Sequence, residues 1–277
     1  MNDKTMIKVH ISDDFDLEKI ALSGQCFRVR RFADGIYRFI KGERVLYIKQ
    51  LERDNYQVSC GDDEWHEVWE DYFDLSRQYA AIRKRAGENN GFISKAAAYS
   101  RGIRVLRQDP WEMLITFIIS QRKNIPAITR SVEALAQKYG RVIKTDYETV
   151  SAFPTPEEMQ AAAEKDLSEC GLGYRTAYVQ DAVSKIVSGT VDLDEMRRMD
   201  DDRLFQELLK IHGVGKKVAN CVRLFGYGRT ACVPVDVWIA RAISDECAGC
   251  DPFPAYGNEA GIVQQFVFYY IRNAERS

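Results

Sequence analysis

The stretch HGVG at 212–215 limits the possible folds of this chain more than any other short run. It follows a helical pattern that Asp200 or Asp201 can cap and whose leucines form one apolar face. A second helical pattern covers 218–225. Two glycines around one valine permit a tight turn and leave N–H groups at a helix start, where an anion can bind without a side chain. We therefore predict two helices joined by an anion-binding hairpin, although a plain turn would fit the GVG triplet equally well.

The N-terminal part of the chain predicts a sheet. Short β-rich runs within 36–60 are broken at 41–43 (KGE) and at 53–55 (RDN), as in an antiparallel meander. From about Tyr72 onward the pattern becomes helical.

Two later helix starts are well marked. Asp109 precedes Pro110, so an N-cap residue is followed by a proline at the first helical position, and the run MLITFII that follows is apolar nearly all round. This helix should be the buried centre of the fold. The run TPEE at 155–158 is a capping box with proline at the first helical position, and its helix should end near Gly171.

These patterns predict an α+β protein. We expect an N-terminal antiparallel sheet domain over 1–90 and a mainly helical region over 91–277, the latter in two lobes with the active cleft between them. The segment from about residue 245 onward should close the base pocket. Neither internal repeats nor low-complexity segments are present.

Charge is unevenly distributed along the chain. The 277 residues have a formal net charge of −2 and a pI near 6.0, which argues against binding nucleic acid by bulk charge. Residues 1–75 contain 11 Lys+Arg against 16 Asp+Glu, whereas 91–140 contain 8 against 3 and 203–241 contain 7 against 2. The basic residues thus gather around the hairpin, although solvated helix faces would give the same pattern.

Composition also bears on the compartment and on metals. No run approaches the roughly 18 apolar residues of a membrane span, so we expect a soluble, intracellular protein that in a bacterium would lie in the cytoplasm or nucleoid. Seven cysteines are an odd number in a long chain, which favours reduced thiols. Cys247 and Cys250 have C-x-x-C spacing but lack the second ligand pair of a zinc site, so we predict no metal.

Around the hairpin, three residues could carry chemistry. Lys217 and Cys221 are four apart and share one helical face, while Lys216 is turned away by roughly 100°. A lysine in a cleft at a helix start has its ammonium form disfavoured, which makes a nucleophilic amine more available. Asp236 lies in the apolar run VPVDV, where it can cap the next helix, stabilise a cation, or do both. Solvated lysines and a plain cap are the alternatives.

An amine nucleophile beside a fixed carboxylate suits attack at an electrophilic sugar carbon. Attack at the anomeric carbon of a nucleotide would expel the base and leave an iminium, whose acidified neighbouring proton permits strand cleavage by elimination.

The hairpin region LLKIHGVGKKVANCVRLFGYGRTACVPVDVWIA resembles the helix-hairpin-helix, Gly/Pro-rich loop and aspartate of base-excision DNA glycosylases. Nearly the whole chain is similar to the 8-oxoguanine DNA glycosylases in particular. The matching segments are ALSGQCFR (21–28), YFDLS (72–76), RGIRVLRQDPWEMLITFIIS (101–120), CGLGYRTAYV (170–179) and AGIVQQFVFYYIR (260–272), in the family's order. The hairpin alone marks only the superfamily, but the segments together are specific.

The resemblance implies a bifunctional glycosylase and lyase that flips 8-oxoguanine out of duplex DNA, excises it and cleaves the abasic site by β-elimination. Lys217 would be the Schiff-base nucleophile and Asp236 the catalytic carboxylate. The backbone of Gly213, Val214 and Gly215 would hold DNA phosphates. It implies no cofactor and no metal, and we expect a monomer that acts on duplex DNA containing 8-oxoguanine.

The resemblance also implies a base pocket. The Gly24 carbonyl would accept the N7 hydrogen that oxidised guanine has and guanine lacks. Phe268 would stack on the extruded base, Gln264 would contact its Watson–Crick edge, and Cys221 would line the other side. For Phe268 and Gln264 the sequence by itself favours a core aromatic and a surface amide.

At the opposite-base site the chain departs from the family. Arg175 matches an arginine that reads the cytosine left behind, and Tyr174 would wedge beside it. The family has an asparagine at Arg122, a second cytosine-reading arginine at Ala127, and a phosphate-contacting histidine at Trp238. Loss of that second arginine predicts relaxed discrimination for cytosine.

Three other functions use such a hairpin. An alkylated-base monofunctional glycosylase would use the aspartate without a lysine nucleophile, so Lys217 argues against it. An endonuclease-III-type enzyme would carry a C-x6-C-x2-C-x5-C run for an iron–sulfur cluster, which is missing here. A non-catalytic damage-binding DNA protein would keep the hairpin for phosphate contacts alone.

Overall fold

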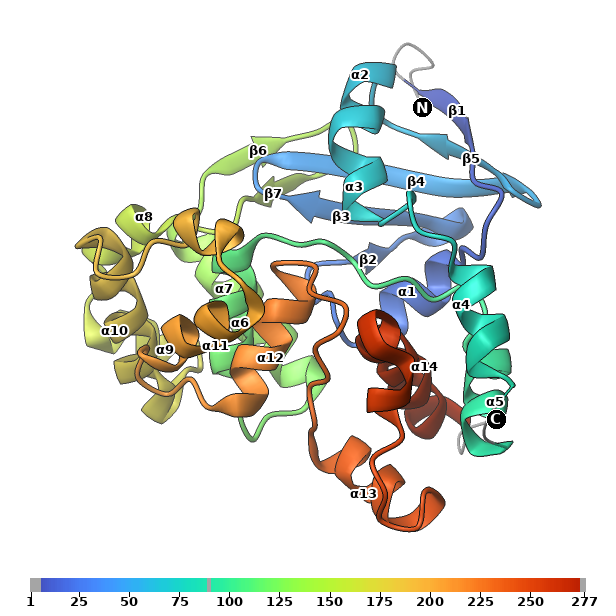
Figure 1. Cartoon of the computed structure of the whole chain (residues 1–277). Coiled ribbons are helices and arrows are strands. Elements are labelled where there is room, and N and C mark those ends of the chain that lie inside the picture. The colour runs from blue at the N-terminus through green and yellow to red at the C-terminus, as the bar shows by residue number, and fades with distance from the viewer. Residues whose placement is uncertain (1–5, 89–90, 275–277) are drawn as a thin grey trace. The chain divides into compact units, whose positions relative to one another are not determined.

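The computed structural model describes residues 6–88 and 91–274. By its contacts the chain forms two compact units that are not consecutive in sequence (Figure 1). Unit 1 comprises Met1–Phe39, Leu46–Arg107 and Gly228–Ser277, and unit 2 comprises Ile40–Val45 and Gln108–Tyr227. The division predicted from the sequence, into a sheet domain over 1–90 and a helical region over 91–277, stays a prediction. Within 6–88 and 91–274, no helix has both the length and the apolar character that a membrane crossing requires.

A five-stranded sheet forms the framework of unit 1. Its strands are β1 (Ile7–His10), β2 (Arg30–Arg31), β3 (Ile36–Lys41), β4 (Arg44–Glu52) and β5 (Asn55–Val58). They are ordered β1-β5-β4-β3-β2 (Figure 1), and the pairs β1–β5, β5–β4 and β3–β2 are antiparallel. Val58 lies opposite Ile7 on one side and opposite Ile48 on the other. The meander predicted over 36–60 is therefore confirmed.

Aromatic side chains fill the core of unit 1. A continuous helical stretch packs there, formed by α2 (Asp62–Glu64), the π-helical turn η2 (Trp65–Trp69) and α3 (Glu70–Tyr72). Trp65, Trp69, Tyr72 and Phe73 are buried, and the rings of Phe39 and Phe73 meet edge to face at 5.1 Å. Spacings of three and four place these rings on one helical face, so the helical stretch starts before the position near Tyr72 that was predicted.

Buried polar contacts close unit 1 beside this core. The Arg104 side chain is fully buried, and its guanidinium lies 4.2 Å from the ring centre of Tyr79. Its N–H groups donate to the carbonyls of Phe73, Asp14, Asp74 and Arg77 and to Asp13 Oδ2, at 2.7 to 3.2 Å. Asp13 also accepts from the backbone N–H groups of Tyr79 and Ala80. It therefore caps a helix that lies far from it in sequence.

The other helices described in unit 1 are α1 (Leu17–Leu22), α4 (Tyr79–Ala86), α5 (Gly91–Tyr99), α13 (Val237–Glu246) and α14 (Ala260–Asn273), with 3₁₀ turns η1 (Ala33–Gly35) and η5 (Phe253–Glu259). Helix α5 lies alongside α14 (Figure 1), and Ser100 Oγ donates to Phe266 O at 2.8 Å. All side chains over 260–267 are buried, so α14 is a core helix of unit 1.

Unit 2 is mainly helical. It contains α6 (Pro110–Ser120), α7 (Ile125–Tyr139), α8 (Pro156–Gln160), α9 (Glu164–Glu169), α10 (Thr176–Val187), α11 (Asp201–Leu209) and α12 (Lys216–Phe225), the 3₁₀ turns η3 (Gly173–Arg175) and η4 (Glu195–Arg198), and the paired strands β6 (Val142–Lys144) and β7 (Thr149–Ser151). Asp109 caps α6 by accepting from Glu112 N at 2.9 Å, and every residue from Pro110 to Ile119 is buried. Helices α7, α10 and α12 pack around α6, so the helix predicted to be the buried centre is the central helix of unit 2.

The helix predicted to start at Thr155 is correct at its start and wrong at its end. The Thr155 hydroxyl accepts from Glu158 N at 3.2 Å, and Glu158 Oε2 accepts from Thr155 N at 2.9 Å, which completes the capping box. The chain then breaks at 161–163, between α8 and α9. Both short helices pack against α10 and bury Met159 and Leu167 respectively. Tertiary packing therefore overrides the high helix propensity of three alanines.

The predicted helix-hairpin-helix is confirmed as α11 and α12. Asp200, rather than Asp201, caps α11 by accepting from Arg203 N at 2.8 Å. Gly213 has φ +82°, in the region that favours glycine, and a Cβ there would lie 2.3 Å from the Tyr178 ring. Both the backbone turn and the close approach of Tyr178 therefore require glycine.

Candidate active site

The hairpin of unit 2 presents open backbone at the start of α12. Gly215 is the N-cap residue, with extended backbone and no side-chain cap. A Cβ on Gly215 would have no atom within 4 Å, so this surface is free of side chains. Val214 is buried and its N–H donates to Ile211 O at 3.0 Å, which fixes the turn. The first N–H groups of α12 thus remain available to an anion.

The structure distinguishes the two lysines that follow the hairpin. Lys216 is exposed, whereas Lys217 is half-buried and its Nζ lies 5.0 Å from the ring centre of Phe117. Among the described residues, no carboxylate forms an ion pair with Lys217. Cys221, one turn later on the same helical face, is buried with 2% exposure. The Lys217 amine therefore lies against apolar surface without a counter-charge.

In unit 1, Asp236 caps α13, which confirms the predicted cap. A single oxygen, Oδ1, accepts from Trp238 N and from Ile239 N, both at 3.0 Å. In the described part of the chain, Oδ2 accepts no hydrogen bond. The flanking Val235 and Val237 are exposed, and Asp236 itself is half-buried. The carboxylate is held in a fixed orientation with one oxygen free.

Gly24 lies in a rigid loop of unit 1. Its φ is +78°, a conformation that favours glycine. The next residue, Gln25, is fully buried; its Nε2 donates to Ser23 Oγ at 2.8 Å and to Arg104 O at 2.7 Å, and its Oε1 accepts from Leu106 N at 2.7 Å. These bonds hold the backbone beside Gly24, including the carbonyl predicted to face the base.

Gln264 and Phe268 lie on α14. Gln264 is 2% exposed, so the alternative of a surface amide is wrong. Its Oε1 accepts from Gln265 Nε2 at 3.1 Å, and Gln265 is also buried. Phe268 is half-buried under Arg272, whose guanidinium lies 5.2 Å from the ring centre. Two buried amides on a core helix are unusual unless polar groups meet them.

The residues of unit 2 that the resemblance places at the opposite-base site differ in exposure. Tyr174 is 54% exposed, whereas Arg175 is buried with 6% exposure and its guanidinium lies 4.3 Å from the Tyr174 ring centre. Arg122 is exposed and has φ +52°, a conformation that asparagine adopts more readily than arginine. In unit 1, Trp238 is 42% exposed on the first turn of α13.

The structure adds residues that the sequence interpretation did not single out. Gln121 and Lys123 make hydrogen bonds to the backbone of the hairpin and of the loop at 171–175. Gln265 contacts Gln264 directly. A run of polar residues between two apolar helices, QRKN at 121–124, is the only signal in the sequence for the first two. Two adjacent glutamines in the apolar pattern of 260–267 are the signal for the third.

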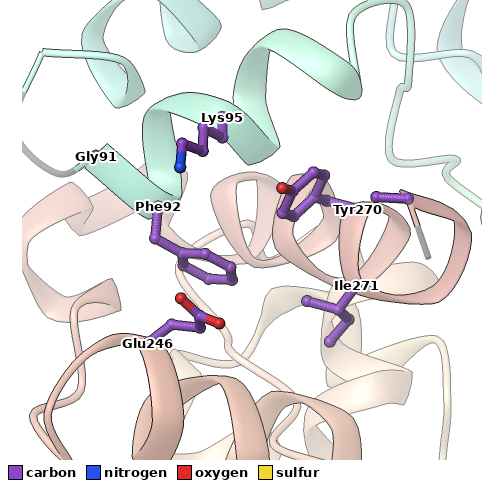
Figure 2. Close-up of a pocket in the computed structure, with 7 residues that line it drawn as sticks. Gly91, Phe92, Lys95, Glu246, Tyr270 and Ile271 are labelled. Carbon is purple, nitrogen blue, oxygen red and sulfur yellow. The ribbon is translucent and has the colours of Figure 1, made fainter.

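A separate hollow lies on another face of α14. Figure 2 shows Phe92 and Lys95 from α5, Tyr270 and Ile271 from α14, and Glu246 from α13 around it. Tyr270 follows Phe268 by two residues and points to a nearly opposite side of the helix. None of the predicted site residues lines this hollow. Among the described residues, no group of three or more His, Cys, Asp and Glu side chains could hold a metal ion.

Comparisons with known families give a consistent result. Residues 6–114 match the model of the 8-oxoguanine DNA glycosylase N-terminal domain, and residues 115–252 match that of the HhH-GPD superfamily of base excision DNA repair proteins.

Relatives and solved structures agree with these matches. The chain is 31% identical over 204 residues to a probable N-glycosylase/DNA lyase of Methanothermobacter thermautotrophicus (63% of this chain, 65% of the relative). It is 39% identical over 169 residues to an N-glycosylase/DNA lyase of Saccharomyces cerevisiae (55% and 45%). The chain thus spans about two thirds and about half of these relatives. The Clostridium acetobutylicum 8-oxoguanine glycosylase/lyase, solved with double-stranded DNA containing cytosine opposite 8-oxoguanine, has a TM-score of 0.92 and 32% identity over 98% of this chain and 97% of that chain.

Proposed function

The chain belongs to the 8-oxoguanine DNA glycosylase family, and we propose that it excises 8-oxoguanine from duplex DNA and then cleaves the resulting abasic site. The observation that carries this proposal is Lys217. It is half-buried at the start of α12, where Gly215 provides no side-chain cap, and it has no carboxylate partner in 6–88 or 91–274. An unpaired amine beside a phosphate-binding turn suits a nucleophile better than a structural cation.

The reaction proceeds from the Lys217 amine. Its nitrogen bonds to C1′ of the flipped nucleotide as the bond from C1′ to the base breaks, and the base leaves with the electron pair and takes up a proton. Opening of the sugar ring at O4′ then leaves a protonated imine between C1′ and Lys217. This iminium acidifies the C2′ hydrogen, and its removal expels the 3′ phosphate in a β-elimination. The free Oδ2 of Asp236 stabilises the positive charge that develops on the sugar.

Base recognition belongs to four residues. The Gly24 carbonyl accepts the N7 hydrogen that marks the oxidised base, because an unmodified guanine would leave that acceptor unpaired. Gln264 contacts the Watson–Crick edge, and Phe268 and Cys221 cover the two faces of the base. Burial of the Gln264 amide supports this role, since a buried amide needs polar partners.

Strand recognition belongs to the hairpin and the exposed residues. The backbone of Gly213, Val214 and Gly215 binds phosphates, and Arg122 and Trp238 contact the DNA backbone. Tyr174 fills the gap left by the flipped base, and Arg175 reads the base opposite. The protein acts inside the cell as a monomer; equilibrium sedimentation with and without duplex DNA checks that state.

Borohydride trapping tests the nucleophile. Wild type, Lys217→Gln and the exposed neighbour Lys216→Gln are incubated with duplex DNA carrying one 8-oxoguanine, and covalent adducts are separated by denaturing electrophoresis. We expect an adduct with wild type and Lys216→Gln and none with Lys217→Gln, because only a primary amine at 217 can form the reducible imine. Binding of the same duplex should survive in all three proteins.

The other outcomes separate the remaining functions. Free 8-oxoguanine without any adduct would indicate a monofunctional glycosylase that relies on Asp236. Binding without adduct or free base would indicate a non-catalytic damage-binding protein. An adduct that persists in Lys217→Gln and is lost in Lys216→Gln would identify Lys216 as the nucleophile.

A further inference from the structure

Three loops of unit 2 are joined through Gln121 and Lys123. The Gln121 side chain donates from Nε2 to Gly213 O of the hairpin at 3.1 Å. The Gln121 carbonyl accepts from Arg175 Nε at 2.9 Å and also from Arg175 Nη2. Lys123 Nζ donates to Gly171 O at 2.5 Å and to Ser131 Oγ at 2.7 Å. One short segment before α7 thus ties the hairpin to the loop at 171–175.

The link between the two loops is reciprocal. Each loop sends a cationic side chain to a backbone carbonyl of the other, Lys123 to Gly171 and Arg175 to Gln121. Burial, followed by the charges of Arg175 and Arg130, lowers the pKa of Lys123. Like charges that are held together at a partly buried position cost stability.

Arg175 is fixed but not fully used by these contacts. A guanidinium has five N–H donors. Two of them serve Gln121 O and a third serves Leu172 O at 3.2 Å. No carboxylate in the described part of the chain pairs with it. Two donors therefore remain for a ligand, on a group whose orientation the protein has already set.

We propose that Lys123 is a positioning residue that holds Arg175 for reading the base opposite the lesion, an inference that rests on the proposed function. Ala127 stands where the family has a second arginine, so Arg175 reads that base alone. Two donors can bond both N3 and O2 of cytosine, whereas adenine offers one acceptor and one donor on the same edge. The discrimination that remains therefore depends on how firmly the loop at 171–175 is held.

Single-turnover excision opposite cytosine and opposite adenine tests this role. We expect Lys123→Met to slow excision opposite cytosine about tenfold, the effect of one charge-assisted hydrogen bond, and to change excision opposite adenine less than about twofold. Lys123→Arg should keep the wild-type ratio, because it can still donate to Gly171 O. Lys138→Met is the matched control, since Lys138 bridges α7 to Asp166 and Glu169. It should leave the ratio unchanged.

A double-mutant cycle identifies the residue through which Lys123 acts. If Lys123 works by holding Arg175, then the double variant Lys123→Met/Arg175→Met should be no slower opposite cytosine than Arg175→Met alone. Additive losses would overturn the proposal. Equal slowing by Lys123→Met opposite every base would also overturn it, because a general structural defect has that signature.

A binding experiment in which no excision can occur separates this inference from the proposed function. Duplexes with a tetrahydrofuran abasic analogue opposite cytosine or adenine are titrated by fluorescence anisotropy. Wild type should bind the cytosine duplex more tightly, and Lys123→Met should lose that preference while Lys123→Arg keeps it. If wild type releases no base from any duplex and this pattern still holds, the proposed function is wrong and the positioning role stands. If excision occurs and the preference persists in Lys123→Met, the positioning role is wrong.

Discussion

Arg104 in unit 1 and Arg175 in unit 2 are both buried guanidinium groups over a tyrosine ring, at 4.2 and 4.3 Å from the ring centres. Both donate mainly to backbone carbonyls. Arg104 matches all five donors with five acceptors, one of which is the carboxylate of Asp13. Arg175 matches three and has no carboxylate partner among the described residues.

The difference separates a structural arginine from one poised for a ligand. When every donor of a buried charge is satisfied and a counter-charge lies nearby, replacing those bonds by bonds to water or to a ligand lowers stability. A buried charge with unused donors can form additional hydrogen bonds when a polar ligand binds. Neighbouring groups agree with this distinction, since Arg104 lies next to acidic Asp13 whereas Arg175 lies near cationic Lys123.

Removal of Arg104 should have the largest effect. Arg104→Met removes a donor from each of four buried carbonyls and removes the cation that pairs with Asp13, so we expect the free energy of unfolding to fall by about 3–5 kcal/mol. Urea denaturation followed by circular dichroism measures this. The control is Arg101→Met, because Arg101 pairs with Asp14 but its side chain is 72% exposed. A loss for Arg104→Met as small as that of the control would remove the contrast between the two arginines.

We expect Arg175→Met to reduce activity far more than stability. It frees only the carbonyls of Gln121 and Leu172, so we expect stability to change by about 1 kcal/mol or less, while excision opposite cytosine slows about tenfold or more. Urea denaturation and single-turnover excision on the same preparations give both values. If unfolding stability falls as far as in Arg104→Met, then Arg175 is a structural residue as well.

The smallest expected effect is on the pH dependence of stability. Burial acts to raise the pKa of Asp13, but the N–H groups of Ala80, Asp14 and Tyr79 and the charge of Arg104 outweigh it, so the pKa is lowered on folding. A lowered carboxyl pKa contributes stability above the unfolded pKa, and that stability is lost as the pH falls through the folded pKa.

The stability advantage of wild type over Asp13→Asn, about 1 kcal/mol at pH 7 for a capping carboxylate, should therefore shrink toward about pH 3. Urea midpoints at both pH values measure it. The advantage of wild type over Arg175→Met should stay constant over the same range, since no carboxylate of the described chain pairs with Arg175. A constant Asp13 difference would show that its charge does not contribute.

Local signals in the sequence predicted much of the fold. The caps at Asp109, Thr155 and Asp236 depend on residues within three positions, so they can be identified without the structure. Asp13 caps α4 across a long stretch of chain, and no local pattern indicates that. The break at 161–163 was missed for the same reason, because packing against α10 decides it.

The candidate site was predictable to a similar extent. Lys217 and Asp236 could be selected by residue type and spacing around the hairpin, and the meander over 36–60 and the helix-hairpin-helix followed from periodicity and turn residues, whereas the positions of β1 and β2 in the sheet did not. Burial of Gln264 was not predictable, since a glutamine in a helical pattern is normally exposed. The bonds from Lys123 to Gly171 and from Arg175 to Gln121 join loops that are far apart in sequence, so spacing could not reveal them.

The single oxygen by which Asp236 caps α13 has an evolutionary consequence. One side chain serves both the local fold, through Oδ1, and the proposed chemistry, through Oδ2. A mutation to an apolar residue removes both at once. Natural selection would therefore eliminate such a mutation even where the activity is no longer needed, because the helix also loses its cap. A descendant of this chain that kept its fold but abandoned catalysis would therefore carry a neutral capping residue at 236, such as asparagine, serine or threonine.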